Sequence, residues 1–400
     1  MRMLIRVSKL FDGLRVVEGG EISVVDGVVR LGKLPGSYDK VIEAEAAIPG
    51  LVDGHVHLVF DQRPRYMRRS LRNVSALFLM HGVASVRDAG NYMSLKDLLR
   101  SISSSLELVP SLMAEKPPLS WPFERAIVGS SDAERVVEVA RCEGCRWVKL
   151  YNNVSESIAR SVVAKARELG LKVSCHVHGI GLRRAIELGV DLVEHFMYLP
   201  ILEPVEEGVE VIELWERIDE GEIEEIAKRM ASRGVAVSTT ISILRGFIGR
   251  LRIDRRKLSK YVTPWYKYYS SKEREWSKVY RKVLRAVRVL KEAGVDIVAG
   301  TDLPNQALTP GLSMWEEIDA LIEAGLGLWE ALSCATGVAK RVLGCSRGTI
   351  EDGTRANIVL TKDPLRSARD LESIDAIVIG DTILRPEELR SELRKVPMWG

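Results

Sequence analysis

The feature that most constrains the fold of this 400-residue chain is a regular alternation of short apolar runs with longer helical stretches. The alternation begins at Ile48 and continues to Asp302. The eight strand-like runs end near residues 57, 88, 113, 150, 176, 195, 239 and 302. Strands that alternate with helical crossovers form parallel sheets. Eight such units predict an α/β fold of the (β/α)8 TIM-barrel type, in which the third strand has the weakest signal.

The two ends of the chain follow a different pattern. Residues 1–47 alternate short apolar runs with turns, and Asp26-Gly27 between two such runs indicates a β-hairpin. After the last strand, Ser313 and Glu316 have the spacing of a capping box that opens a helix to Gly325, and a second helix is expected over 328–343. Short β runs then return. We therefore expect residues 1–47 and 345–400 to form one small accessory β-sandwich domain, and residues 48–344 to form the barrel.

The chain contains six histidines, and five of them follow directly after apolar runs. His55 and His57 are two residues apart, so on a strand both side chains point to the same side and can reach one metal ion. His176 and His178 repeat this spacing. A single such pair is a weak signal, since many are surface residues. His81, the sixth histidine, lies in a helical run and receives no role.

Active sites of such barrels lie at the carboxyl ends of the strands. The polar residues expected there are His55, His57, Lys149, His176, His195 and Asp302. Imidazole nitrogens with a carboxylate suit zinc, manganese or cobalt. Each residue also has an ordinary interpretation, such as a barrel-rim charge for Lys149 or a turn cap for Asp302. Together, potential ligands at five strand ends predict a metal site.

Several sequence segments, taken together, resemble the motifs of a known family. They are 49–57 (PGLVDGHVH), 82–88 (GVASVRD), 148–149 (VK), 176–179 (HVHG), 189–195 (GVDLVEH), 293–302 (AGVDIVAGTD) and 348–353 (GTIEDG). The chain resembles the amidohydrolase superfamily over nearly its whole length. Within that superfamily it is similar to the imidazolonepropionase-related branch, which includes metal-dependent prolidases.

The resemblance implies a binuclear centre. It would place His55, His57 and Asp302 on one metal and His176 and His195 on the other, with Lys149 as a bridging carbamate. Two divalent ions, zinc first and manganese or cobalt as alternatives, would generate a bridging hydroxide at neutral pH. Asp302 would act as general base and then general acid. His178 would hydrogen-bond the substrate carbonyl or oxyanion, a role for which relatives often carry another polar residue.

The expected function is hydrolysis of an amide-type carbon–nitrogen bond in a small molecule, with an Xaa-Pro dipeptide as one candidate. Hydrolysis of lactones, cyclic ureas or phosphotriesters is the alternative on the same site. A non-catalytic barrel is the rival from another class, but such relatives tend to lose metal ligands, and all six are present here.

Composition limits the expected partners and cellular location of the protein. The net charge of +3 gives no reason to expect a nucleic-acid partner. No apolar stretch reaches the roughly 18 residues that span a bilayer, and the N-terminus lacks the pattern of a secretory signal. With five cysteines and no dense framework, a cytoplasmic protein is expected, with homo-oligomerisation left open. Only two Gln and six Asn beside abundant charge suggest a heat-adapted source.

Two insertions interrupt the barrel pattern. Residues 203–225 are strongly acidic and 245–260 strongly basic, which predicts either two solvated faces or a mutual contact. The basic stretch continues into an aromatic-rich region within 245–290, which could form a substrate lid or a packed helical excursion. Four arginines after the first strand could bind a substrate carboxylate, although a solvated face is favoured: Arg63, Arg65, Arg68 and Arg69.

Overall fold

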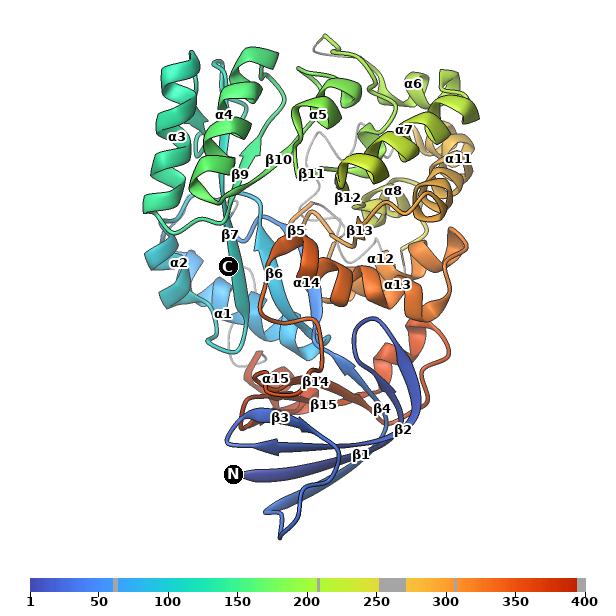
Figure 1. The fold of residues 1–400 in the computed structure, drawn as a ribbon. Coiled ribbons are helices and arrows are strands. Elements are labelled where there is room, and N and C mark those ends of the chain that lie inside the picture. The colour runs from blue at the N-terminus through green and yellow to red at the C-terminus, as the bar shows by residue number, and fades with distance from the viewer. Residues whose placement is uncertain (60–63, 207–208, 252–270, 306–307, 394–400) are drawn as a thin grey trace.

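The computed structural model describes residues 1–59, 64–206, 209–251, 271–305 and 308–393, without the side chains of 64–70 and 392. Figure 1 shows a barrel surrounded by helices, with a separate sheet below it that contains the N-terminal strands and the red strands from the end of the chain. This arrangement confirms the predicted α/β class, the barrel and the accessory sheet domain.

The barrel consists of eight parallel strands in the order β5-β6-β7-β9-β10-β11-β12-β13. Their bounds are β5 (Leu51–Val56), β6 (Val83–Asp88), β7 (Glu107–Glu115), β9 (Trp147–Leu150), β10 (Lys172–Cys175), β11 (Leu192–Val193), β12 (Ala236–Ser238) and β13 (Ile297–Val298). A two-residue strand, β8 (Arg125–Ala126), pairs with the end of β7. A parallel bridge between Val56 and Leu303 joins the first strand to the segment after the last. All eight predicted strands are present, including the third.

Apolar runs form these strands because parallel strands in such a barrel are covered on both faces. Every residue of β5, β6 and β9 is buried. Inside the barrel, one apolar cluster takes a residue from each of six strands: Val52, Val109, Trp147, Leu192, Ala236 and Val298. The cluster also contains residues of α14, so apolar side chains close this end of the barrel, and the buried polar side chains lie nearer the carboxyl ends of the strands.

Helices surround the barrel (Figure 1). They are α1 (Pro64–Met80), α2 (Leu95–Ser101), α3 (Ser130–Cys142), α4 (Glu156–Leu169), α5 (Leu182–Leu188), α6 (Val211–Arg217), α7 (Glu220–Arg233), α8 (Ile241–Phe247), α11 (Glu273–Glu292), α12 (Leu312–Glu323), α13 (Leu328–Cys334) and α14 (Gly337–Leu343), with a 3-10 turn η1 (Phe196–Tyr198). Local signals set their ends. Ser155 accepts from Ile158 N to cap α4, and Asp219 and Glu222 form a capping box on α7.

The accessory sheet contains seven strands in the order β16-β15-β14-β4-β1-β2-β3. They are β1 (Arg2–Phe11), β2 (Val16–Val25), β3 (Val28–Leu31), β4 (Lys40–Pro49), β14 (Asn357–Thr361), β15 (Ile374–Ile379) and β16 (Thr382–Leu384); η3 (Ala368–Ser373) and α15 (Pro386–Leu393) complete this end. The predicted hairpin joins β2 and β3 through Asp26 and Gly27, whose φ angles are 50° and 77°. Val28 also bridges to Arg355, so strands from both ends of the chain share one apolar core. The exact division of the chain at residues 47 and 345 stays a prediction.

One chain segment links the two sheets directly. Only Gly50 separates β4, in the accessory sheet, from β5, the first barrel strand. A Cβ atom at position 50 would lie 2.3 Å from Asn357 Oδ1 and 2.6 Å from Ala84 Cβ. Glycine is therefore needed where the chain passes from one sheet into the other.

Two local predictions about the helices after the barrel are wrong. α12 begins after Gly311, whose φ is 76°, and Ser313 lies inside the helix and accepts from Thr309 N instead of forming a capping box. The helix expected over 328–343 is two helices, α13 and α14. They are separated at Thr336, whose φ of −141° is not helical.

The charged insertions form ion pairs with neighbouring helices. In the acidic segment, Glu203 and Glu225 pair with Arg183 of α5, and Glu220 pairs with Arg285 of α11. Arg245 and Arg250 pair with acidic residues of α12 instead. Residues 252–270 lie outside the described residues, so the contact between the two insertions and the substrate lid stay predictions.

Across the described part of the chain, no helix has the length and apolar character needed to cross a membrane.

Candidate metal centre

The end of β5 brings His55 and His57 to the centre of the barrel mouth. Asp53, two residues earlier, accepts hydrogen bonds from Thr301 N at 3.0 Å and Thr301 Oγ1 at 2.7 Å, which ties β5 to the segment after β13. Gly54 permits this close approach, because a Cβ there would lie 2.4 Å from Val298 Cγ1. The first and last barrel strands are thus joined where the histidines begin.

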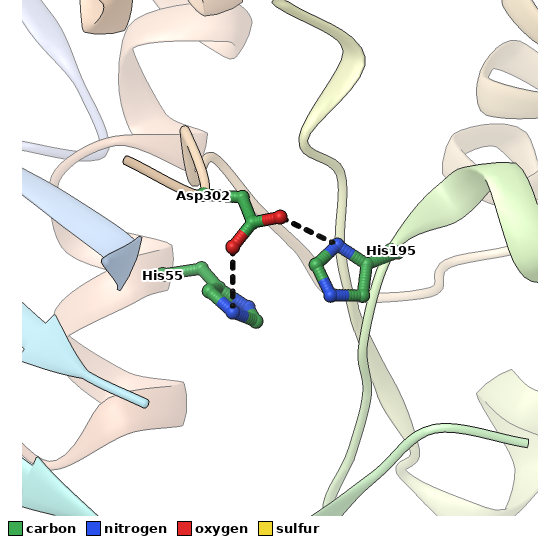
Figure 2. A group of neighbouring side chains, drawn as sticks. All are labelled: His55, His195 and Asp302. Carbon is green, nitrogen blue, oxygen red and sulfur yellow. Dashed lines mark ion pairs between the residues drawn. The ribbon is translucent and has the colours of Figure 1, made fainter. Parts of the chain in front are cut away.

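Asp302 lies between three of the histidines. Its Oδ1 is 3.3 Å from His55 Nε2 and 3.6 Å from His57 Nε2, and its Oδ2 is 3.8 Å from His195 Nδ1. Figure 2 shows the carboxylate of Asp302 pointing between the rings of His55 and His195. Asn305 Nδ2 donates to Asp302 Oδ2 at 2.6 Å and orients it.

Three neighbouring strand ends carry non-glycine residues in the left-handed region. The φ angles of His195, Thr240 and Asp302 are 61°, 51° and 58°. Such conformations cost free energy for residues with a Cβ atom and gather at functional sites. At these three positions the backbone conformation sets the direction in which the side chain leaves the barrel rim.

In each of four histidines, the Nδ1 atom lies within hydrogen-bond distance of a polar group behind the ring. His55 Nδ1 lies 2.7 Å from Glu194 Oε2, and His57 Nδ1 lies 2.6 Å from the Gly90 carbonyl. His176 Nδ1 lies 2.8 Å from Asn152 Oδ1, and His195 Nδ1 lies 3.0 Å from Thr240 Oγ1. Metal-binding histidines are held in this way, with the second nitrogen left for the ion.

The other sequence-predicted residues gather around the same point. Lys149 Nζ is 3.3 Å from His55 Nε2 and fully buried. The ring of His176 lies 4.6 Å from that of His195, and His176 Nε2 is buried with no hydrogen-bond partner among the described residues. His178 packs edge-on against Tyr198 at 4.3 Å, and its Nδ1 is likewise buried without a partner.

Burial sets the protonation of the site. It lowers the pKa of His55 to about 4, and those of His57, His176 and His195 well below the usual value, which keeps their rings neutral. The positive charge of Lys149 lowers these pKa values further. Burial is also the main reason why the pKa of Lys149 itself is lowered to about 8. Burial also raises the pKa of Asp302 to about 7. Neutral imidazole is the form that binds metal.

The donor set fits a divalent metal ion. Ligand atoms of His55, His195 and Asp302 lie within 4.8 Å of one another. His57, His176 and Lys149 surround them, and the buried Nε2 of His176 finds no hydrogen-bond partner among the residues that the structure describes. The six residues predicted from strand ends are therefore together in space.

Sequence reasoning missed a second set of residues behind the histidines. Glu194, Asn152, Thr240 and the Gly90 carbonyl each contact a ring, and Arg87 donates to Glu194 Oε1 at 2.6 Å. Arg87 and Glu194 are the one pair that left a signal. Arg87 follows Val86 in β6 and Glu194 follows Val193 at the end of β11, so each charge comes directly after a buried apolar residue, where it needs a partner.

Other singled-out residues lie elsewhere. His81 Nδ1 donates to the Leu77 carbonyl at 2.8 Å and its ring packs against Trp315, so it has a structural environment. Cys142 and Cys145 are free thiols, the first exposed and the second buried. Arg63 and the side chains of Arg65, Arg68 and Arg69 lie outside the described residues.

A profile of the amidohydrolase family matches residues 46–383. The chain therefore belongs to the amidohydrolase family, and the prediction of an enzyme of this hydrolase class is confirmed. Metal dependence is general in this family, and the cluster of His55, His195 and Asp302 agrees with it.

Three solved structures illustrate the shared fold. An Xaa-Pro dipeptidase with bound methionine matches with a TM-score of 0.71 and 19% identity, over 96% of this chain and 100% of its own. An ochratoxinase from A. niger has a TM-score of 0.73 and 17% identity, over 96% and 95%. A bottromycin amidohydrolase has a TM-score of 0.73 and 21% identity, over 98% and 88%. At these identities the likeness shows the fold. A search of curated protein sequences finds no match.

Proposed function

We propose that this protein is a binuclear metal-dependent hydrolase that cleaves an amide-type carbon–nitrogen bond in a small molecule. The observation that carries the proposal is that His55 Nε2 and His57 Nε2 each lie within 3.6 Å of Asp302 Oδ1, near His176, whose buried Nε2 has no hydrogen-bond partner in the described part of the chain. His55, His57 and Asp302 would hold one ion, and His176 and His195 the other. Zinc suits these ligands best, and manganese or cobalt would also be accepted.

Lys149 would join the two ions after it reacts with carbon dioxide. Its neutral amine adds to carbon dioxide and releases one proton, which gives a carbamate with two oxygen ligands. The lowered pKa of Lys149, about 8, leaves part of the amine neutral near physiological pH. The fully buried position beside His55 excludes water from the product.

Divalent ions held here would polarise a carbonyl and lower the pKa of bound water. Asp302 would accept the proton of the attacking water and deliver it to the leaving amine. Asn305 holds the Oδ2 atom of Asp302, so its Oδ1 remains directed at the histidines.

His178 would bind the substrate oxygen. It is two residues beyond His176, and the two rings lie 5.9 Å apart. Burial lowers the pKa of His178 to about 4, so its ring is neutral and has one N–H to donate. A donor aimed at the developing oxyanion is typically worth a factor of about 100 or more in rate.

The proposed substrate is a dipeptide of the Xaa-Pro type. The support is fold similarity to an Xaa-Pro dipeptidase, strengthened by the amide substrates implied by the names of other neighbours. The second candidate is hydrolysis of a lactone, cyclic urea or phosphotriester, because the same activated water attacks all of these.

The test is a substrate panel with metal-reconstituted protein, read by mass spectrometry. The panel holds Xaa-Pro and other dipeptides, N-acyl amino acids, lactones and phosphotriesters, and Lys149→Ala serves as the matched inactive variant. Dipeptide cleavage that falls at least about 1,000-fold in Lys149→Ala supports the proposal. Turnover confined to lactones or phosphotriesters overturns the carbon–nitrogen assignment, and full activity of Lys149→Ala overturns the bridging carbamate.

A further inference from the structure

Arg87 crosses the barrel interior and is among the largest fully buried side chains of the protein. Its guanidinium donates to the Gly54 carbonyl at 3.1 Å and to Ser174 Oγ and Glu194 Oε1, each at 2.6 Å. Its Cζ lies over the ring of Trp147, 4.8 Å from the ring centre.

Each of these contacts lies next to a histidine of the centre. Gly54 precedes His55, Ser174 is two residues before His176, and Glu194 precedes His195. A single side chain from β6 is thus bonded to β5, to β10 and to the residue directly after β11, and the histidines lie at the ends of these three strands. Because a guanidinium is planar, it holds its three partners in a fixed arrangement.

Glu194 extends this contact to a metal-facing ring. It is fully buried, with Oε1 bound to Arg87 and Oε2 at 2.7 Å from His55 Nδ1. A carboxylate can only accept, so His55 Nδ1 carries the hydrogen, and the lone pair of Nε2 faces the space beside Asp302 and Lys149 where an ion would lie. Arg87, Glu194 and His55 thus form a chain of hydrogen bonds from the barrel interior to the proposed metal ligands.

We propose that Arg87 is a positioning residue for the metal centre, acting through Glu194 on the ring of His55 and through three strands on the spacing of the histidines. This inference rests on the proposed function. A purely structural arginine would stabilise the barrel and leave the metal affinity unchanged. A positioning arginine changes the affinity even in a variant that folds as well as the wild type.

The deciding variant is Arg87→Met/Glu194→Leu. Replacing both members of a buried ion pair by apolar residues leaves no unpaired charge, and such replacements are often neutral or stabilising. His55 then loses its acceptor and the three strands lose their common partner. Glu194→Gln is the second variant, since it preserves the shape of the side chain and removes its charge.

Arg347→Met is the matched control. Arg347 also binds β6, with Nη1 donating to the Ala84 carbonyl at 2.8 Å, but at the opposite end of the strand from the centre. This substitution therefore removes an arginine that binds the same strand, and it leaves the groups behind the histidines in place.

The measurement is Zn²⁺ affinity and stoichiometry by chelator competition, with the visible spectrum of the Co²⁺-substituted protein as a second readout of ligand geometry. We expect both Glu194 variants to lose about 10- to 100-fold in affinity and to change the cobalt spectrum, as loss of a partner behind a metal ligand typically does. Arg347→Met is expected to match the wild type.

The outcomes separate this inference from the proposed function. A wild-type protein that binds no Zn²⁺ or Co²⁺ overturns both. A wild type that binds metal, together with a folded double variant of unchanged affinity and spectrum, overturns only the role of Arg87. If the double variant does not fold, the same result for Glu194→Gln decides against it.

Discussion

Two buried arginines, Arg87 and Arg245, form ion pairs in different parts of the same barrel. Arg87 is fully buried and faces one carboxylate, Glu194. Arg245 in α8 is 9% exposed and faces three carboxylates of α12: Glu316, Asp319 and Glu323. Arg87 therefore neutralises a single negative charge in the barrel interior, whereas Arg245 binds three negative charges on a surrounding helix.

The difference shows how the same pairing serves two purposes. The carboxylate of Glu194 is shared between Arg87 and a histidine of the centre, so any change in Arg87 is passed to His55. The three acids around Arg245 hold one helix against another, since they lie on one helix, while Glu317 separately accepts from Ile241 N and Ser242 N at the start of α8. A counter-ion shared with a histidine therefore couples Arg87 to the site, whereas the sharing of Glu323 couples Arg245 to Arg250 and Tyr280 instead.

The largest effect is expected for Arg87→Met alone. This change leaves Glu194 buried without its cation, and breaking a buried pair in this way typically costs about 3–5 kcal/mol. Urea unfolding of the metal-free protein measures the loss. Most of it should return in Arg87→Met/Glu194→Leu, and a single variant as stable as the wild type would contradict the view that the charge balance at Glu194 depends on Arg87.

A smaller effect is expected for Arg245→Met. Glu316 is fully buried and loses this cation, but Asp319 and Glu323 are partly exposed, and Glu323 keeps Arg250. We therefore expect a loss of about 3 kcal/mol, the lower end for a broken buried pair. The affinity for Zn²⁺ should remain that of the wild type, because Glu317 still fixes the segment that carries Thr240. A drop in affinity as large as that of the Glu194 variants would remove the distinction between the two arginines.

The smallest effect is a pH dependence at Glu317. Burial raises the pKa of this carboxyl above its usual value, so the folded state binds a proton that the unfolded state has released. Stability from this group is therefore lost as the pH rises from the unfolded pKa through the folded one. Relative to the wild type, Glu317→Gln should gain stability as the pH rises above the unfolded-state pKa of about 4.3, as urea unfolding at each pH would show. Parallel pH curves would mean that the hydrogen bonds from α8 fully offset burial.

The eight strands and six of the site residues could be predicted because both follow local rules. A parallel strand is an apolar run, and barrel chemistry lies where such runs end, so His55, Lys149 and Asp302 were recognisable one strand at a time. Arg87 and Glu194 were not recognised as partners, because their contact depends on closure of the barrel across several intervening strands. Ser313 had the right spacing for a cap, but Gly311 turned the chain two residues earlier.

The single residue between β4 and β5 has a consequence for how the protein unfolds. The strand that ends in His55 and His57 is a direct continuation of a central strand of the accessory sheet, without a linker that could absorb strain. Separation of the accessory sheet from the barrel would therefore displace β5 and its histidines. Metal binding to those histidines would in turn stabilise the accessory sheet. We expect both sheets to melt as one cooperative unit, with a midpoint that rises when metal binds.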